Sequence, residues 1–133
     1  MQKPPTRPLR VLPRPMFLNL LQIQMPVGAV TSILHRLSGV VLALGVPLVM
    51  FLLWRSLDSQ EGFSQVMAWL HLPVFQAVLL VLVGALAHHV LAGVRHMLTD
   101  FNVGSTLHVA RRSAWGVNVA AAVLALLTLV VLP

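Results

Sequence analysis

Histidines interrupt an otherwise apolar stretch between residues 74 and 98. If this stretch forms one helix, each residue advances about 100° and about 1.5 Å, so His89 and His96 lie on one face. Two small residues on that face, Ala85 and Gly93, flank His89 and leave room for a flat, bulky group. Because imidazole is a common ligand of haem iron, this face predicts a haem site with His89 pointing at it.

A second set of polar residues lies near the beginning of an earlier apolar stretch. Its members follow helical spacing and share one face: Ser32, His35, Arg36 and Gly39. One interpretation is that Arg36 extends toward lipid headgroups, as basic residues near the ends of membrane helices often do. A serine and a histidine on the same face favour a ligand site instead.

The depth of each histidine limits which of them can bind one iron together. His89 lies about 16 Å from the end of its helix, near the middle of the membrane. His96 shares its face, and two ligands on one face cannot reach opposite sides of a porphyrin. With a span beginning at Thr31, His35 lies about 10 Å shallower than His89. Unless His88 serves, we expect the second axial ligand to come from another polypeptide.

The shallower polar residues suit the propionates of the same haem. Propionates lie about 8–10 Å from the iron, and these carboxylates need cationic partners in a low dielectric. Four side chains lie at that level: His35, Arg36, Arg95 and His96. One alternative is that His89 is merely hydrogen-bonded in a helix interface. Another is a metal site without haem, which would need three or four convergent ligands.

The composition is that of an integral membrane protein. Of 133 residues, 58% are hydrophobic and 9% are charged, whereas soluble domains average about 45–50% and about 25%. Three spans would leave no room for a separate soluble catalytic domain. The absence of cysteine excludes thiolate ligation of an iron–sulfur cluster and covalent attachment of haem. The basic residues behind the net charge of +6 flank the apolar spans, so we expect contact with membrane lipid and not with nucleic acid.

The elements that must position these residues are expected to be helices. We predict an all-α membrane protein in which residues 1–30 form a basic, proline-containing cytoplasmic tail and interfacial segment. Residues 31–133 would form a three-helix transmembrane anchor, with spans at about 31–54, 74–98 and 115–132. Because basic residues are concentrated on one side of the spans, we expect the N-terminus in the cytoplasm.

Loops are expected between the spans. Residues 55–73 are predicted to form a polar loop with a short helix containing Met67 to Leu70. Three basic residues are expected in a solvated cytoplasmic loop before the third span: His108, Arg111 and Arg112. Within that span, Gly116 and Ala120 form a small-residue pattern that permits close helix contact. Asn118 is expected to hold helices together by hydrogen bonding.

Two motifs carry a resemblance to a known family. Ser32-Ile-Leu-His-Arg-Leu-Ser-Gly39 is similar to a Ser-x-x-His-Arg-x-Ser/Thr-Gly segment. His89-Val-Leu-Ala-Gly-Val-Arg-His-Met-Leu-Thr-Asp100 is similar to a His-x-x-x-Gly-x-Arg-His-x-x-x-Asp segment. Both segments, in this order in a chain of three spans, are typical of the large cytochrome b membrane-anchor subunit of succinate dehydrogenase, respiratory complex II. The chain resembles this family over most of its length.

The resemblance implies roles for the residues of both motifs. His89 would be the axial ligand of haem b, which would be shared with a small anchor subunit that supplies the other ligand. Ser32 and Arg36 would line the ubiquinone site, and His35 with Arg36 would meet the haem propionates. The family often has tyrosine before the axial histidine, whereas this chain has His88. The spacing to the glycine and arginine that follow favours His89 over His88.

The resemblance also implies the complex in which the chain works. The chain would pack with the small anchor subunit into a helix bundle in the bacterial inner membrane. An iron–sulfur subunit and a flavoprotein subunit would dock on its cytoplasmic face, and electrons would pass from the iron–sulfur subunit to ubiquinone. This chain alone would not oxidise succinate. Two alternatives stay open: the anchor of a quinol:fumarate reductase, and a structural membrane anchor without a redox centre.

Overall fold

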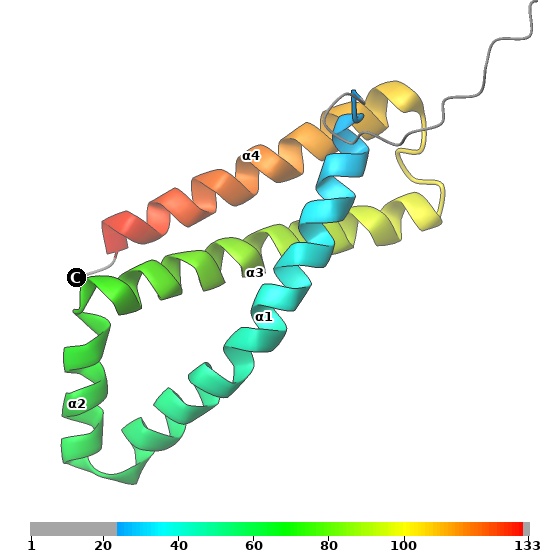
Figure 1. The fold of residues 1–133 in the computed structure, drawn as a ribbon. Coiled ribbons are helices and arrows are strands. Elements are labelled where there is room, and N and C mark those ends of the chain that lie inside the picture. Colours follow the sequence, from blue (N-terminus) through cyan, green and yellow to red (C-terminus); the bar gives the residue numbers. More distant parts are fainter. Residues whose placement is uncertain (1–23, 132–133) are drawn as a thin grey trace, which may run out of the picture.

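A computed structural model describes residues 24–131 and folds them into helices (Figure 1). The elements are α1 (Val27–Asp58), α2 (Gln60–Leu70), α3 (Pro73–Asp100) and α4 (Leu107–Val131). No strand occurs in residues 24–131, and the prediction of an all-α fold is confirmed. The basic tail expected in residues 1–30 lies, up to residue 23, outside the described residues.

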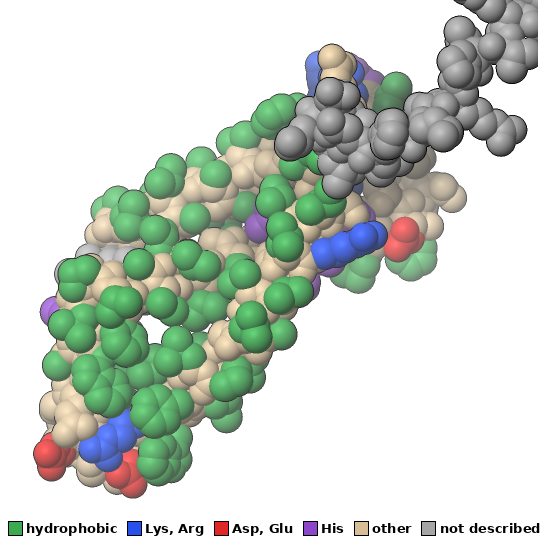
Figure 2. Space-filling view, in the orientation of Figure 1, with side chains coloured by type: hydrophobic (Ala, Val, Ile, Leu, Met, Phe, Trp, Pro, Cys, Tyr) green, Lys and Arg blue, Asp and Glu red, His purple; other side chains and the backbone are tan. Residues whose placement is uncertain are grey.

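Three of these helices, α1, α3 and α4, are long and apolar enough to cross a membrane. Their 32, 28 and 25 residues correspond to about 48, 42 and 38 Å, against about 30 Å for the hydrocarbon core of a bilayer. They extend beyond the spans expected at about 31–54, 74–98 and 115–132, because hydropathy marks only the part of a helix that lies in lipid. Figure 2 shows hydrophobic side chains over most of the visible face and charged ones toward its ends. Such a surface suits lipid or other membrane helices.

The connection between α1 and α3 contains the expected short helix with Met67 to Leu70, but this helix, α2, begins earlier, at Gln60, and takes up most of the predicted loop. Ser59 caps α2 by accepting a hydrogen bond from the Gly62 N–H at 3.0 Å. A Cβ atom at Gly62 would collide with the backbone carbonyl of Arg55, so this tight turn requires glycine. The loop was predicted from the polar residues of this segment, which do not prevent a helix outside the hydrocarbon.

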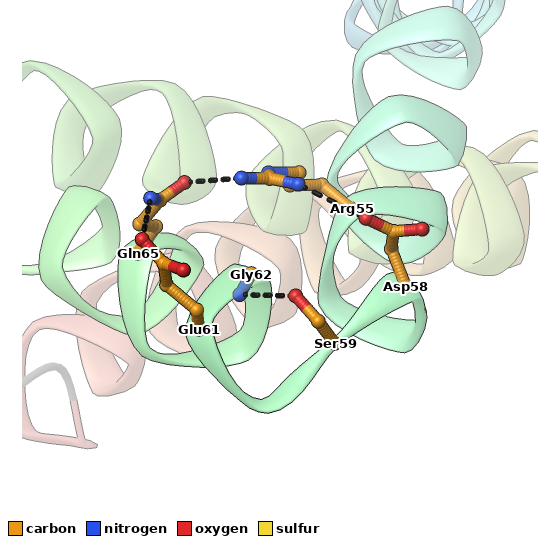
Figure 3. A network of polar contacts seen from close by, with 6 residues as sticks. All are labelled: Arg55, Asp58, Ser59, Glu61, Gly62 and Gln65. Carbon is orange, nitrogen blue, oxygen red and sulfur yellow. Dashed lines mark hydrogen bonds and ion pairs between the residues drawn. The ribbon is translucent and has the colours of Figure 1, made fainter.

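Polar and aromatic contacts hold α2 against the ends of α1 and α3. Arg55 pairs with Asp58 at 3.1 Å and donates a hydrogen bond to Gln65 at 2.8 Å, as Figure 3 shows. Trp69 of α2 stacks with one aromatic ring of α1 and one of α3, with its centroid 6.3 Å from each. This end of the molecule is therefore a closed corner, visible in Figure 1.

The helix α4 begins at Leu107, earlier than the expected third span. Three basic residues predicted in a loop therefore lie on its first turns: His108, Arg111 and Arg112. The turn before α4 uses positive φ angles, 60° at Asn102 and 72° at Gly104, which these residue types tolerate. Because basic side chains can extend into water while their backbone stays helical, hydropathy placed the beginning of this helix too late.

The central helix is α3, which packs against both α1 and α4 (Figure 1). Small residues allow the close approach: Ala92 of α3 and Ala114 of α4 are fully buried. At the other crossing, Gly45 of α1 lies directly against the side chain of Leu82 of α3. Side chains of ordinary size at these positions would separate the helices.

The small residues of α4 that pack inside the chain are not the expected ones. Gly116 and Ala120 are exposed, and nothing in the described residues lies within 4 Å of a Cβ built at Gly116. The inward residues are Ala114 and Ala121, on the same side as Asn118. Small residues occur on more than one face of this helix, and the polar side chain decides which face packs inward.

The crossing of α1 and α3 should not tolerate a bulky side chain at Gly45. A Cβ there already meets a methyl group of Leu82, so Gly45→Leu should lower the free energy of unfolding by about 1–3 kcal/mol. Gly116→Leu is the matched control, because it makes the same change at an exposed helical position. Thermal melting of the purified subunit in detergent measures the effect. Equal melting temperatures for both variants would contradict this packing.

Candidate functional site

The helix α3 presents adjacent rows of side chains to its two neighbours. The row toward α1 consists of His89, Gly93 and His96. The row toward α4 contains His88 and Arg95. Because successive helical residues advance about 100°, neighbours in the sequence point toward different helices. The row toward α1 is the one that the histidine spacing predicts.

Three histidines form one cluster across the interface of α1 and α3. His35 of α1 stacks on His89, with ring centroids 4.2 Å apart and an angle of 16° between the planes. Its other neighbour is His96, with centroids 5.3 Å apart and the rings tilted by 57°. A Cβ at Gly93 would lie 3.4 Å from Nε2 of His35. Glycine therefore lets the ring of His35 fit between the two α3 histidines.

This cluster corrects the predicted depth of His35. A helix that begins at Thr31 predicts that His35 lies about 10 Å shallower than His89, whereas their rings are in contact. The helix α1 begins at Val27 and not at Thr31, which adds a turn before His35, and α1 crosses α3 obliquely (Figure 1). Two stacked rings leave no space for a porphyrin between them. His35 and His89 therefore cannot be the two axial ligands of one haem.

The hydrogen bonds of His89 define where its proton lies. Its Nδ1 is 3.1 Å from the backbone carbonyl oxygen of His35 and 3.2 Å from Oγ of Ser38. A carbonyl oxygen only accepts hydrogen bonds, so Nδ1 carries the proton and donates it. In a neutral ring with this tautomer, the lone pair lies on the other nitrogen, Nε2, which has no hydrogen bond within residues 24–131. This is the form of imidazole that binds a metal ion.

His88 belongs to a buried hydrogen-bond network that joins the three long helices. Its Nε2 lies 3.1 Å from Oδ1 of Asn118 in α4, and the hydroxyl of Thr31 in α1 lies 3.1 Å from the same oxygen. His88 is 8% exposed, and its Nδ1 is buried without a hydrogen-bond partner in the described part of the chain. The predicted role of Asn118 is confirmed. That His88 is its partner could not be predicted from the sequence, because helical spacing does not pair residues of two different helices.

Arg95 points toward α4 and not toward the histidine cluster. Its Nε donates to Oγ of Ser113 at 3.1 Å, and its Nη2 donates to the carbonyl oxygen of Ala110 at 3.1 Å. These bonds fasten the first turns of α4 to α3. Position along a helix predicts the level of a side chain in the membrane, but not the neighbour that it finds.

Ser32 and Arg36 lie one helical turn apart on α1, beside His35. Ser32 is half-buried and Arg36 is exposed. Within residues 24–131, neither side chain makes a hydrogen bond or an ion pair. A hydroxyl donor and a cation thus stay available to a ligand or to another subunit.

The three long apolar helices, which carry a histidine cluster between α1 and α3, are those of a multi-pass membrane protein. Residues 10–128 match the family described as succinate dehydrogenase/fumarate reductase transmembrane subunit, and the chain belongs to this family. It is 35% identical over 107 residues to the succinate dehydrogenase cytochrome b556 subunit of Coxiella burnetii, covering 80% of this chain and 86% of that one. It is 32% identical over 122 residues to the subunit of the same name from Paracoccus denitrificans, covering 89% and 91%. The resemblance carried by the two motifs is confirmed.

Breaking the network of His88 should weaken the bundle. Asn118→Leu removes the acceptor of His88 within the described residues and should lower the free energy of unfolding by about 1–2 kcal/mol. Thr128→Val is the control, because the hydroxyl of Thr128 bonds only to a carbonyl of its own helix. Unfolding of the purified subunit by SDS in mixed micelles measures both variants. An Asn118→Leu protein as stable as the control would contradict the network.

Proposed function

We propose that this chain is the haem b-binding membrane anchor of succinate:ubiquinone oxidoreductase, and that it contributes half of the haem site and part of the ubiquinone site. Its family supports this, and two relatives carry cytochrome b556 in their names. The observation that carries the proposal is the hydrogen bonding of His89, which holds Nδ1 and leaves Nε2 free as the axial ligand. Haem b, when bound, supplies a one-electron carrier within the membrane.

The second axial ligand would come from the small anchor subunit, which would pack with this chain into a helix bundle. Of the other histidines of this chain, His35 is stacked on His89 and His96 shares its helix face. His88 has its Nε2 engaged with Asn118. The remaining two lie near helix ends, His71 and His108. The histidines of this chain therefore support one axial bond and not two.

The polar groups around the stacked rings suit the haem propionates. His35, Arg36 and His96 can present N–H donors to carboxylates, and charge-assisted hydrogen bonds of this kind are strong in a low dielectric. Arg95 lies at the same level but is hydrogen-bonded to α4. We propose that Arg95 supports the propionate end of the site by holding α4 against α3.

Ser32 and Arg36 are proposed to bind ubiquinone. Reduction of a quinone places negative charge on its oxygens, and a hydroxyl donor with a fixed cation stabilises that charge. Both side chains are uncommitted within residues 24–131 and one turn apart. Electrons would reach the quinone from the iron–sulfur subunit.

The distribution of arginines supports an orientation. Arg111 and Arg112 are exposed on the first turns of α4, near the beginning of α1, whereas Arg55 at the opposite end is paired with Asp58 (Figure 1). By the positive-inside rule, the end with the exposed Arg111 and Arg112 would face the cytoplasm, with the N-terminus on the same side. The iron–sulfur and flavoprotein subunits would dock there, and the bacterial inner membrane would hold the complex.

A quinol:fumarate reductase anchor is the second candidate, because the description of the family includes that enzyme. Both enzymes would use such an anchor with opposite directions of electron flow. Rates of succinate oxidation and fumarate reduction by the assembled complex distinguish them. A structural anchor without a redox centre would instead give a purified subunit that is colourless and a complex without the spectrum of a b-type haem.

Replacing His89 should remove the haem, and replacing His88 should not. In the purified complex, His89→Ala should abolish the reduced-minus-oxidised spectrum of a b-type haem, because it removes the half-buried imidazole proposed to bind the iron, whereas that of His88 is buried. His88→Ala is the matched control and should keep the spectrum while lowering the melting temperature. A full spectrum in His89→Ala together with its loss in His88→Ala would reverse the assignment.

Replacing Ser32 or Arg36 should impair quinone reduction selectively. Ser32→Ala and Arg36→Ala should each lower ubiquinone reduction by about 10- to 100-fold, because the charge on the reduced quinone loses a donor or a cation. Succinate oxidation with an artificial acceptor should stay unchanged. Ser56→Ala, which removes a hydroxyl bonded only to its own helix at the other end of α1, should affect neither rate. Parallel loss of both activities in Ser32→Ala would indicate a role in assembly instead.

A further inference from the structure

Ser38 completes a triangle of polar atoms beside His89. Its hydroxyl donates to the backbone carbonyl oxygen of His35 at 2.8 Å. Its Oγ is also 3.2 Å from Nδ1 of His89, and the same Nδ1 is 3.1 Å from the His35 carbonyl oxygen. Ser38 is only 7% exposed, so water does not compete for these contacts.

The acceptors decide the direction of each hydrogen bond. Because the hydroxyl proton of Ser38 points to the His35 carbonyl, its oxygen presents a lone pair to His89. The Nδ1–H of His89 is then shared by two acceptors, which hold the ring in one tautomer. Against the same ring, a Cβ at Gly39 would lie 3.0 Å from Cε1, so the backbone of α1 leaves the ring little freedom to turn.

We propose that Ser38 is a positioning residue that sets the orientation and donor strength of His89, and through it the reduction potential of haem b. This inference rests on the proposed function, in which His89 binds the iron. Acceptors on Nδ1–H make the imidazole a stronger donor at Nε2, and a stronger donor stabilises ferric iron. Removal of one acceptor therefore raises the reduction potential.

The test compares three variants in the assembled complex: Ser38→Ala, Ser38→Thr and Thr31→Val. Optical redox titration and EPR of the oxidised haem are the readouts. At a fixed potential, Ser38→Ala should have about three times the wild-type ratio of reduced to oxidised haem. At 59 mV per tenfold change, this ratio corresponds to a reduction potential raised by about 28 mV. The g values in the EPR spectrum should also change. Ser38→Thr keeps the hydroxyl and should restore both. Thr31→Val removes another buried hydroxyl from the same face of α1, bonded to Asn118 and not to His89, and should change neither.

An unchanged potential and EPR signal in Ser38→Ala would overturn the proposal, as would an equal shift in Thr31→Val or a failure of Ser38→Thr to restore the signal. Loss of haem from Ser38→Ala alone would support it. Loss from Thr31→Val as well would attribute the effect to packing and overturn it. The His89→Ala complex tests the proposed function separately from the role of Ser38. If this complex keeps the haem, His89 is not the iron ligand, whatever the effect of Ser38→Ala.

Discussion

In hydrocarbon no water is available to satisfy a polar group, so each one must find its partner inside the protein. The bundle largely meets this constraint where α3 crosses its neighbours, with His88 bonded to Asn118 and His89 bonded to Ser38, although Nδ1 of His88 has no partner in residues 24–131. Such bonds form only if the helix backbones come close together. The small residues at the crossings follow from that requirement, as Gly39 illustrates: a Cβ there would press on the ring of His89 at 3.0 Å.

Adjacent histidines on α3 have different neighbours because one residue turns the helix by about 100°. The ring of His88 enters the interior between three helices, where its Nε2 is hydrogen-bonded to Asn118 and its Nδ1 is buried. The ring of His89 enters the interface with α1, where one nitrogen is bonded and the other is not. A histidine pair in a membrane helix therefore need not be redundant, since one ring can hold the bundle together while its neighbour serves chemistry.

Much of this arrangement could be predicted from the sequence, because hydropathy and helical period are local properties. The three long helices, the common row of His89 and His96, and the bonding role of Asn118 were all predicted correctly. The errors concern properties that depend on a second helix. The level of His35 depends on how α1 crosses α3, and the direction of Arg95 depends on an acceptor in α4. The ends of α2 and α4 depend on capping and packing and not on hydropathy.

The corner formed by α1, α2 and α3 bears on how the chain enters the bilayer. Arg55 is the one arginine of residues 24–131 at that corner, and it carries its own counter-ion in Asp58 and a further acceptor in Gln65. A guanidinium that moves together with a carboxylate loses less hydration energy in crossing hydrocarbon than a bare one. The corner carries Arg55 against Asp58 and Glu61, whereas the opposite edge bears the exposed Arg111 and Arg112. In the orientation proposed above, this corner would be the leading edge of the α1–α3 hairpin during insertion, and the arginine-rich edge would be the retention signal.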